Sequence, residues 1–356
     1  MIGTIDINGR QVGPGVPAYL VAEISANHGQ NFEHAVKIVK AAKEAGADAI
    51  KIQTYTPDTL TINCNNEFFK IVNGTLWEGR NLHDLYSEAY TPWEWQPRLQ
   101  EIANQLKMDF FSTSFDETAV DFLEKMNVPV HKVASFETVD MAFLRKIAKT
   151  GKPVIMSTGM ATLAEIDEAV QTIREAGGDK LILLKCVSAY PAPPEEMNLR
   201  TILHMAEAFD VPVGLSDHTL GIAVPVAAVA LGACIIEKHF TLSRATPGPD
   251  NAFSMEPQEF KAMAEAVRTA EKAVGTVHYG VSEKESISRV FRRSLFVVKD
   301  MQAGETFTAV NMRSIRPGYG LHTRYLKEVM GRKASRSIQR GTPLTWDLVA
   351  GSCVNT

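Results

Sequence analysis

Two histidines occupy equivalent positions in neighbouring segments of the sequence. His218 follows the apolar run VPVGLS in the stretch LSDHT, and His239 ends the run CIIEKH. If both runs are strands of one barrel, the imidazoles meet at adjacent strand ends and could share a divalent metal ion, with coordination positions left for water or a substrate oxygen. The alternative is one acid–base histidine beside one structural histidine. Asp217 and Glu237 could support a metal site as outer or water-mediated ligands.

Lysine, hydroxyl and carboxylate side chains end most of the other expected strands. Because side chains two positions apart share a face of a strand, Lys51 and Gln53 point together, whereas Lys238 should point away from the site. Ammonium and hydroxyl groups gathered at strand ends suit the phosphate and carboxylate of one small substrate. The set comprises Glu23, Lys51, Gln53, Thr113, Lys132, Ser135, Ser157, Lys185, Ser188, Ser216 and Glu237.

A lysine on a barrel strand would also permit Schiff-base aldol chemistry, which is the rival reaction class. That chemistry needs one lysine in an apolar pocket with a lowered pKa. The lysines here stand among hydroxyls and carboxylates, which favours a charged, anion-binding role.

The elements that must position these residues alternate regularly. Short β-branched runs and longer helical stretches follow each other, which is typical of βαβ units and a parallel sheet. The eight expected strands are 19–25, 48–53, 109–114, 130–135, 153–158, 181–186, 211–216 and 234–240. The expected helices are 32–45, 92–106, 117–126, 141–149, 163–176, 199–209, 221–231 and 257–274.

Eight such units predict an α/β fold, a (β/α)8 TIM barrel with its active face at the carboxyl ends of the strands. An open doubly wound sheet fits less well, because no GxGxxG follows the first strand. Four glycines, expected to cap helices in the left-handed conformation, are Gly46, Gly151, Gly177 and Gly232.

Two stretches depart from the barrel pattern. Residues 54–91 form a long connection, with Trp77, Trp93 and Trp95 in or beside it, and such a connection is expected to serve as a lid or substrate loop. After Gly275 the alternation of strand-like and helical stretches ends. We expect a barrel domain at 1–280, a linker at 281–291 and, from its alternating apolar residues and turn signals, a small β-rich module at 292–356. A module of this size should lean on the barrel or on a neighbouring subunit.

Charge, apolar content and cysteine spacing exclude several classes of protein. The chain has 356 residues, 45% of them hydrophobic, and a formal net charge of −4, so neither nucleic acid nor a membrane surface is an expected partner. It starts without an apolar signal region and has no long uninterrupted apolar stretch, so a cytoplasmic location is expected. The four cysteines form no CxxC pair and should be reduced thiols that bind no zinc: Cys64, Cys186, Cys234 and Cys353.

Several segments together resemble the sialic acid synthase family. They are AEISANHGQ, AIKIQTYTPDTLT, FSTSFDETAVDFLE, HKVASFE, VIMSTGMAT, SDHTLGIAVPVAAVALGA and IEKHFTLSR. The last 65 residues resemble the antifreeze-protein-like (SAF) domain of that family. The segments CVSAYPAPPEEMNLRT and RSIRPGYGLH are most similar to the pseudaminic acid synthase branch; the legionaminic acid and N-acetylneuraminate synthases are the alternatives.

The resemblance implies a reaction and a set of partners. Phosphoenolpyruvate condenses with an N-acylated hexose to give a nine-carbon 2-keto acid and phosphate. A divalent metal, usually Mn²⁺ with Mg²⁺ or Co²⁺ as alternatives, is implied on His218 and His239, and Glu23 or Glu237 would stabilise positive charge at C2. The implied phosphoenolpyruvate-binding residues are Lys51, Thr113, Lys132, Ser135, Ser157, Ser188 and Ser216. The implied sugar-binding residues are Gln53, Tyr190, Asp250 and Arg316.

Two further points follow from the resemblance. Arg316 matches an arginine that reaches the sugar from a partner subunit, which implies a domain-swapped homodimer. Ser188 departs from the N-acetylneuraminate enzymes, which carry asparagine at that position, so its phosphate contact is in question. The pseudaminic acid branch implies a 6-deoxy, 2,4-diacetamido sugar, and an apolar wall, for which 54–91 is a candidate, should face its methyl group.

Overall fold

The computed structural model describes residues 2–72 and 76–351. The chain forms two compact units, Met1–Gly275 and Thr276–Thr356. Cys64, Cys186 and Cys234 are free thiols, whereas Cys353 lies outside the described residues. Within the described ranges, no helix is both long enough and apolar enough to cross a bilayer.

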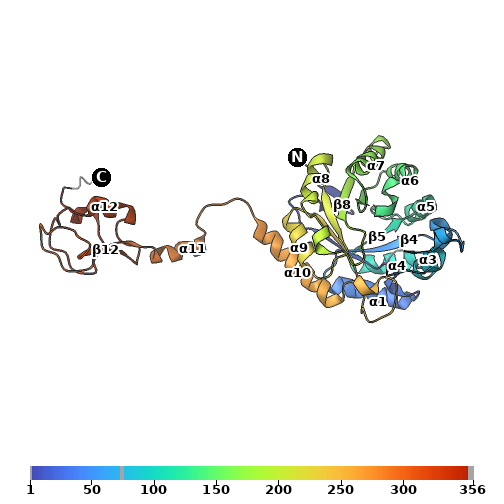
Figure 1. Ribbon diagram of the computed structural model, residues 1–356, viewed down its shortest axis with the longest axis horizontal. Coiled ribbons are helices and arrows are strands. Elements are labelled where there is room, and N and C mark those ends of the chain that lie inside the picture. Colours follow the sequence, from blue (N-terminus) through green and yellow to red (C-terminus); the bar gives the residue numbers. More distant parts are fainter. Residues whose placement is uncertain (1, 73–75, 352–356) are drawn as a thin grey trace. The chain divides into compact units, whose positions relative to one another are not determined.

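The first unit is built on a closed barrel of parallel strands, which confirms the predicted fold class (Figure 1). Each strand pairs with the next one in the sequence, and the last pairs with the first. The strands are β3 (Tyr19–Glu23), β4 (Ala49–Thr54), β5 (Asp109–Ser114), β6 (His131–Val133), β7 (Val154–Ser157), β8 (Leu181–Cys186), β9 (Val213–Asp217) and β10 (Ile235–His239).

Helices surround the strands, as Figure 1 shows. Those that follow the barrel strands are α1 (Phe32–Glu44), α4 (Gln96–Gln105), α5 (Glu117–Lys125), α6 (Met141–Ala148), α7 (Leu163–Glu175), α8 (Thr201–Phe209), α9 (Ala223–Ala230) and α10 (Pro257–Val274). Four glycines follow helices with φ between 70° and 93°, as predicted for left-handed caps, which glycine adopts without strain: Gly46, Gly151, Gly177 and Gly232.

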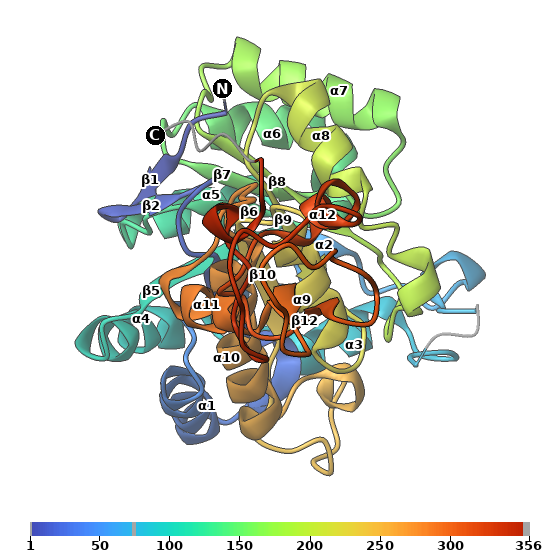
Figure 2. The same ribbon diagram turned by 90° about the vertical axis from the view of Figure 1, so that its left-hand side faces the viewer.

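Two apolar layers hold the barrel together. The larger fills the space between strands and helices, and the smaller fills the barrel interior with side chains such as Val21, Ala49 and Phe111. The hairpin of β1 (Ile5–Ile7) and β2 (Arg10–Val12), dark blue in Figure 2, adds buried Ile7 and Val12 to this interior layer. The hairpin therefore covers the amino-terminal end of the barrel, and the carboxyl-terminal end is left for the site.

The long connection between β4 and α4 contains helices of its own and is more than a loop. Helix α2 (Pro57–Leu60) begins at a Thr56 capping box, and α3 (Leu82–Ala89) is capped by Asn81. Trp93 Nε1 donates a hydrogen bond of 3.0 Å to the Tyr55 carbonyl oxygen and so ties the end of the connection to its start.

The second unit has its own small core. Strands β11 (Ser294–Val297) and β12 (Met312–Ile315) form an antiparallel pair, and most of the remaining chain is irregular (Figure 2). Helix α12 (Leu326–Val329) and several isolated β-bridges complete it. The predicted β character is therefore distributed over single bridges instead of long strands. Buried residues of this core include Leu295, Phe307 and Leu344.

Element boundaries differ from the predictions at a few places. Strand β6 ends at Val133, two residues early, because the chain turns into a 3-10 helix (Ser135–Val139). Strand β9 starts after Pro212, which has no N–H to donate to a neighbouring strand. The expected linker contains helix α11 (Glu283–Ser288), which starts with a capping box at Ser282.

Candidate active site

A polar layer follows from the alternation of side chains along the barrel strands. Val21 and Ala49 belong to the apolar interior, and the residues two positions further along are Glu23 and Lys51. Because alternate residues share a face, these polar side chains stand just above the interior core, toward the carboxyl ends of the strands. The same step along other strands leads to Thr113, Lys132, Ser157 and Glu237.

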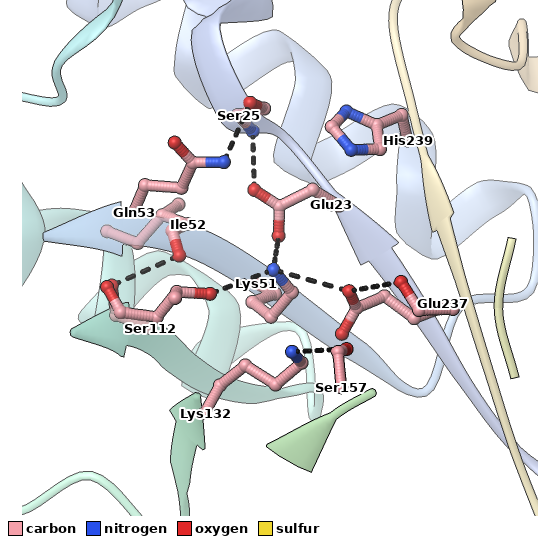
Figure 3. Close-up of polar contacts among 12 residues, drawn as sticks. Glu23, Ser25, Lys51, Ile52, Gln53, Ser112, Lys132, Ser157, Glu237 and His239 are labelled. Carbon is pink, nitrogen blue, oxygen red and sulfur yellow. Dashed lines mark hydrogen bonds and ion pairs between the residues drawn. The ribbon is translucent and has the colours of Figure 1, made fainter. Parts of the chain in front are cut away.

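Lys51 lies at the centre of this layer (Figure 3). Its Nζ forms an ion pair with Glu23 and lies 3.5 Å from Glu237 Oε1. It also donates a hydrogen bond of 3.0 Å to Thr113 Oγ1. Burial would lower the pKa of Lys51, but the two carboxylates outweigh burial and raise it. The Lys51 side chain is therefore a charged ammonium group.

The two carboxyl groups beside Lys51 differ in their affinity for a proton. Burial raises the pKa of Glu23 to about 7, although Lys51 opposes the shift. Burial acts on Glu237 too, but Lys51 and Lys132 outweigh it and lower its pKa. Glu23 can therefore hold a proton near neutral pH, whereas Glu237 stays ionised, which is a common arrangement in acid–base sites.

A second lysine faces the same space. Lys132 is buried, and its Nζ donates hydrogen bonds of 2.7 Å to Ser157 Oγ and to the Val133 carbonyl oxygen. Burial lowers the pKa of this ammonium group, an effect that Glu237 partly offsets. An anionic ligand near Lys132 would stabilise its charged form.

Hydroxyl groups gather next to Lys132. The Gly159 N–H donates a hydrogen bond of 3.1 Å to Ser135 Oγ. A Cβ at Gly159 would lie 2.8 Å from Ser135 Oγ and closer still to Ser188 Oγ, so glycine leaves the room that the two hydroxyls need. Ser188 Oγ is buried and has no hydrogen-bond partner among the described residues. A buried, unpaired hydroxyl of this kind is suited to a polar ligand.

The two histidines lie side by side, as predicted. Their ring centroids are 5.4 Å apart. His218 Nδ1 is 2.8 Å from the Val187 carbonyl oxygen, which can only accept a hydrogen bond, so Nδ1 carries a proton. Burial would lower the pKa of His218, but Cys186 and the Val187 carbonyl oxygen outweigh burial and raise it. Burial lowers the pKa of His239 well below its ordinary value, so this imidazole is neutral.

These features fit a divalent metal on the two imidazoles. His239 Nδ1 is buried without a hydrogen-bond partner within the described ranges, and Asp250 Oδ2 is 3.9 Å away. Glu237 Oε2 is likewise buried and unpaired there. The described residues contain no cluster of three or more His, Cys, Asp or Glu side chains arranged for a metal ion. Further ligands would therefore have to come from water or substrate, as in open catalytic sites.

One cavity of about 540 Å³ gathers most of the predicted site residues. Its lining includes Lys51, Gln53, Thr113, Lys132, Ser135, Ser157, Tyr190, Ser216, His218, Glu237, His239 and Asp250. Glu23 is fully buried beneath it and contacts Lys51. Ser188, whose Oγ lies close to Gly159, is not among the lining residues, and Arg316 is exposed in the second unit. The roles assigned to these residues stay predictions.

A family model, the NeuB family, matches residues 38–279, which is more than half of the chain. The chain belongs to the NeuB family. A second model, the SAF domain, matches residues 292–350. Both matches confirm the resemblance to the sialic acid synthases and their carboxyl-terminal domain.

Individual NeuB relatives align along nearly the whole chain. A pseudaminic acid synthase of Campylobacter jejuni is 47% identical over 92% of this chain and 95% of its own length. The pseudaminic acid synthase of Helicobacter pylori is 44% identical over 93% of this chain and 97% of its own. The crystal structure of an N-acetylneuraminic acid synthetase from Leptospira borgpetersenii superposes with a TM-score of 0.72 at 30% identity, covering 81% of this chain and 95% of the other.

Sequence reasoning missed several residues of this NeuB cavity. Glu137 lines it, and burial raises the pKa of its carboxyl to about 7. Cys186, expected only to be a reduced thiol, is buried and also lines the cavity. Ser25 donates a short hydrogen bond to Asp250 and accepts one of 2.9 Å from Gln53 Nε2. Ser25 ends the strand expected at 19–25, which was the available signal for it, whereas Glu137 lies in a 3-10 helix after β6 and gave no such signal.

Asp217 does not support the imidazoles in the predicted way. Its Oδ2 accepts a hydrogen bond of 2.7 Å from Lys238 Nζ, and its side chain also accepts from the Thr219 N–H and hydroxyl. Lys238 and Asp217 face each other because they are paired in the β9–β10 register. As predicted from strand alternation, Lys238 does not line the cavity. The buried ion pair braces β9 and β10 on the side away from the site.

Proposed function

We propose that this NeuB chain is a pseudaminic acid synthase. It joins phosphoenolpyruvate to the open-chain form of 2,4-diacetamido-2,4,6-trideoxy-altropyranose and releases phosphate. The observation that carries the proposal is the convergence of two buried ammonium groups, Lys51 and Lys132, and two adjacent imidazoles on one cavity. The Campylobacter and Helicobacter relatives are pseudaminic acid synthases, which supports pseudaminic acid as the product. Legionaminic acid and N-acetylneuraminate synthesis are the alternatives within the family.

Phosphoenolpyruvate occupies the lysine side of the cavity. Its phosphate and carboxylate groups bind the ammonium groups of Lys51 and Lys132, and the hydroxyls of Ser135 and Ser157 add hydrogen bonds. Thr113 Oγ1 already accepts a hydrogen bond from Lys51 and so fixes the direction of that ammonium group. The substrate is thus held with its C3 carbon toward the histidine side.

Carbon–carbon bond formation takes place between the two halves of the cavity. C3 of phosphoenolpyruvate attacks the aldehyde carbon of the sugar, and positive charge develops at C2. Glu237, which stays ionised beside Lys51, stabilises this charge. Water then adds at C2, and the adduct expels phosphate together with its bridging oxygen, which leaves a ketone. Glu23, with its pKa near neutrality, is placed to hold a proton during these steps.

His218 and His239 would hold the divalent metal, Mn²⁺ with Mg²⁺ or Co²⁺ as alternatives. A bound ion supplies Lewis acidity toward the aldehyde oxygen of the sugar. The neutral state of His239 supports this assignment, as does the Nδ1 hydrogen bond of His218, which leaves Nε2 as the nitrogen that would bind a metal. Tyr190 packs against His218 with ring centroids 4.3 Å apart and restricts its orientation.

A Schiff-base aldolase is the more distant alternative. Such an enzyme needs a neutral lysine amine. Lys51 is ion-paired and charged, so the alternative would have to use Lys132, whose pKa burial lowers. Borohydride reduction with substrate would trap a covalent adduct in that case only.

The proposal includes a cytoplasmic, domain-swapped homodimer. Arg316 follows β12 in the SAF domain and is exposed, which leaves its guanidinium available to the sugar of a partner subunit. Small domains with a limited core gain stability from such assembly.

Three sugars test the proposed function. The full chain is incubated with Mn²⁺, phosphoenolpyruvate and either the diacetamido altrose, its legionaminic-type isomer or N-acetylmannosamine, and released phosphate is measured. We expect kcat/KM for the diacetamido altrose to exceed that for each other sugar by at least about tenfold. A higher value for either other sugar would reassign the product. No phosphate release with any sugar would contradict the reaction.

A further inference from the structure

The NeuB cavity has two chemically different faces. The ends of the barrel strands provide its charged and hydroxylated floor, whereas the long β4–α4 connection provides a wall of apolar and aromatic side chains. This apolar wall consists of Tyr55, Leu60, Ile71, Leu82, Leu85 and Tyr86. All six lie within 32 residues of the sequence, so the wall belongs to one segment and can vary independently of the catalytic floor.

Local packing fixes the wall in place. The Tyr55 ring packs edge-to-face against Tyr86 and against Phe115, with centroids 5.9 Å and 5.2 Å apart. Tyr55 is 2% exposed and Leu85 is 7% exposed. Trp77 Nε1 donates a hydrogen bond of 3.0 Å to the Pro249 carbonyl oxygen, which ties the same segment to the connection after β10. These contacts hold the wall to the barrel at two separate points.

The position of the wall determines which part of the sugar it meets. The aldehyde carbon, C1, must lie between the lysines and the imidazoles, because its new bond is formed to C3 of phosphoenolpyruvate. C6 is the opposite end of the open chain and extends away from the floor. We infer that the apolar wall receives the C6 methyl group and makes the site selective for a 6-deoxy sugar over one that carries a 6-hydroxymethyl group. This inference rests on the proposed function.

Desolvation is the physical reason for the preference. A methyl group buried on the wall leaves water at no cost in hydrogen bonds, whereas a hydroxyl at the same place gives up its hydrogen bonds to water. Glu137 is the polar group beside the wall, because it also lines the cavity; burial raises the pKa of the Tyr86 phenol, and Glu137 adds to that rise. If the wall and not the Glu137 carboxylate sets the preference for a methyl group, a Glu137→Gln variant should keep that preference.

Binding of unreactive sugar alcohols tests the wall separately from the reaction. Two alditols are compared that differ only at C6, one with a methyl and one with a hydroxymethyl group, and each is titrated calorimetrically into the full chain loaded with phosphoenolpyruvate and Mn²⁺. We expect the methyl compound to bind more tightly by a factor on the order of 10². Equal Kd values, or no binding of either alditol, would overturn the inference.

Variants of the wall should change this ratio. Leu82→Asn adds an amide to the wall and should reduce the Kd ratio about tenfold, and Ile71→Thr is a milder second variant in case the first fails to fold. Ile62→Asn is the matched control, because Ile62 belongs to the same segment, is 58% exposed and does not line the cavity. A ratio that stays at the wild-type value in both folded wall variants would contradict the inference. Turnover of the diacetamido altrose reports separately on the proposed reaction.

Discussion

Replacement of Lys51 by methionine is expected to lower kcat/KM for phosphoenolpyruvate by on the order of 10³-fold. Methionine keeps much of the length of lysine but cannot bind an anion. The ammonium group of Lys51 contacts Glu23, Glu237 and Thr113 in the free enzyme. Its loss raises the pKa of Glu23 further, so Glu23 is protonated, and leaves the Glu237 carboxylate to repel the negative substrate. The measurement is the initial rate of phosphate release over a range of phosphoenolpyruvate concentrations.

Lys185→Met is the matched control for this variant. Lys185 also lies on a barrel strand, but its Nζ donates to the Cys186 carbonyl oxygen and the residue does not line the cavity. We expect its kcat/KM to stay within a few-fold of wild type. If Lys51→Met were folded by circular dichroism and lost less than tenfold, the anion-binding role of Lys51 would be wrong.

Under the proposed function, His239→Ala should abolish tight binding of Mn²⁺ and reduce kcat by on the order of 10³-fold or more, since a Lewis acid held there would contribute several kcal/mol to the transition state. Among the described residues, the imidazoles that line this part of the cavity are those of His218 and His239, 5.4 Å apart between ring centroids. One remaining imidazole cannot hold an ion firmly. Phosphoenolpyruvate binding on the lysine side should survive, because His239 contacts neither Lys51 nor Lys132 in the described hydrogen-bond network.

Measurements of metal content and of phosphoenolpyruvate binding distinguish the loss of a metal ligand from misfolding of the variant. His28→Asn is a suitable control, because His28 is a buried histidine that contacts Thr91 and does not line the cavity. It should keep its Mn²⁺ and its activity. Wild-type Mn²⁺ affinity in folded His239→Ala would show that the ligands lie elsewhere.

Strand alternation accounts for most of what could be predicted. The run AIKIQT places Lys51 and Gln53 on one face of β4, and IIEKH does the same for Glu237 and His239 on β10. All four line the cavity. Because barrel strands are in parallel register, polar residues near their carboxyl ends must converge, whatever the helices outside contain.

Features that depend on contacts across strands or in turns could not be predicted. The pairing of Lys238 with Asp217 requires the β9–β10 register, which no single strand reveals. Glu137 lies in a 3-10 helix, where the alternation of a strand no longer applies. The apolar wall could be predicted only as far as the segment 54–91, and not residue by residue. The orientation of the four-residue helix α2 is set by packing and not by its own sequence period.

The fate of the bridging oxygen tests the proposed reaction most directly. The complete enzyme is allowed to turn over phosphoenolpyruvate and the diacetamido altrose in oxygen-18 water, and the phosphate is analysed by mass spectrometry. Cleavage of the C–O bond after addition of water at C2 predicts phosphate without solvent label. One oxygen-18 atom in each phosphate would mean that water attacks phosphorus, and that the lysine, carboxylate and histidine groups of this cavity serve a different reaction.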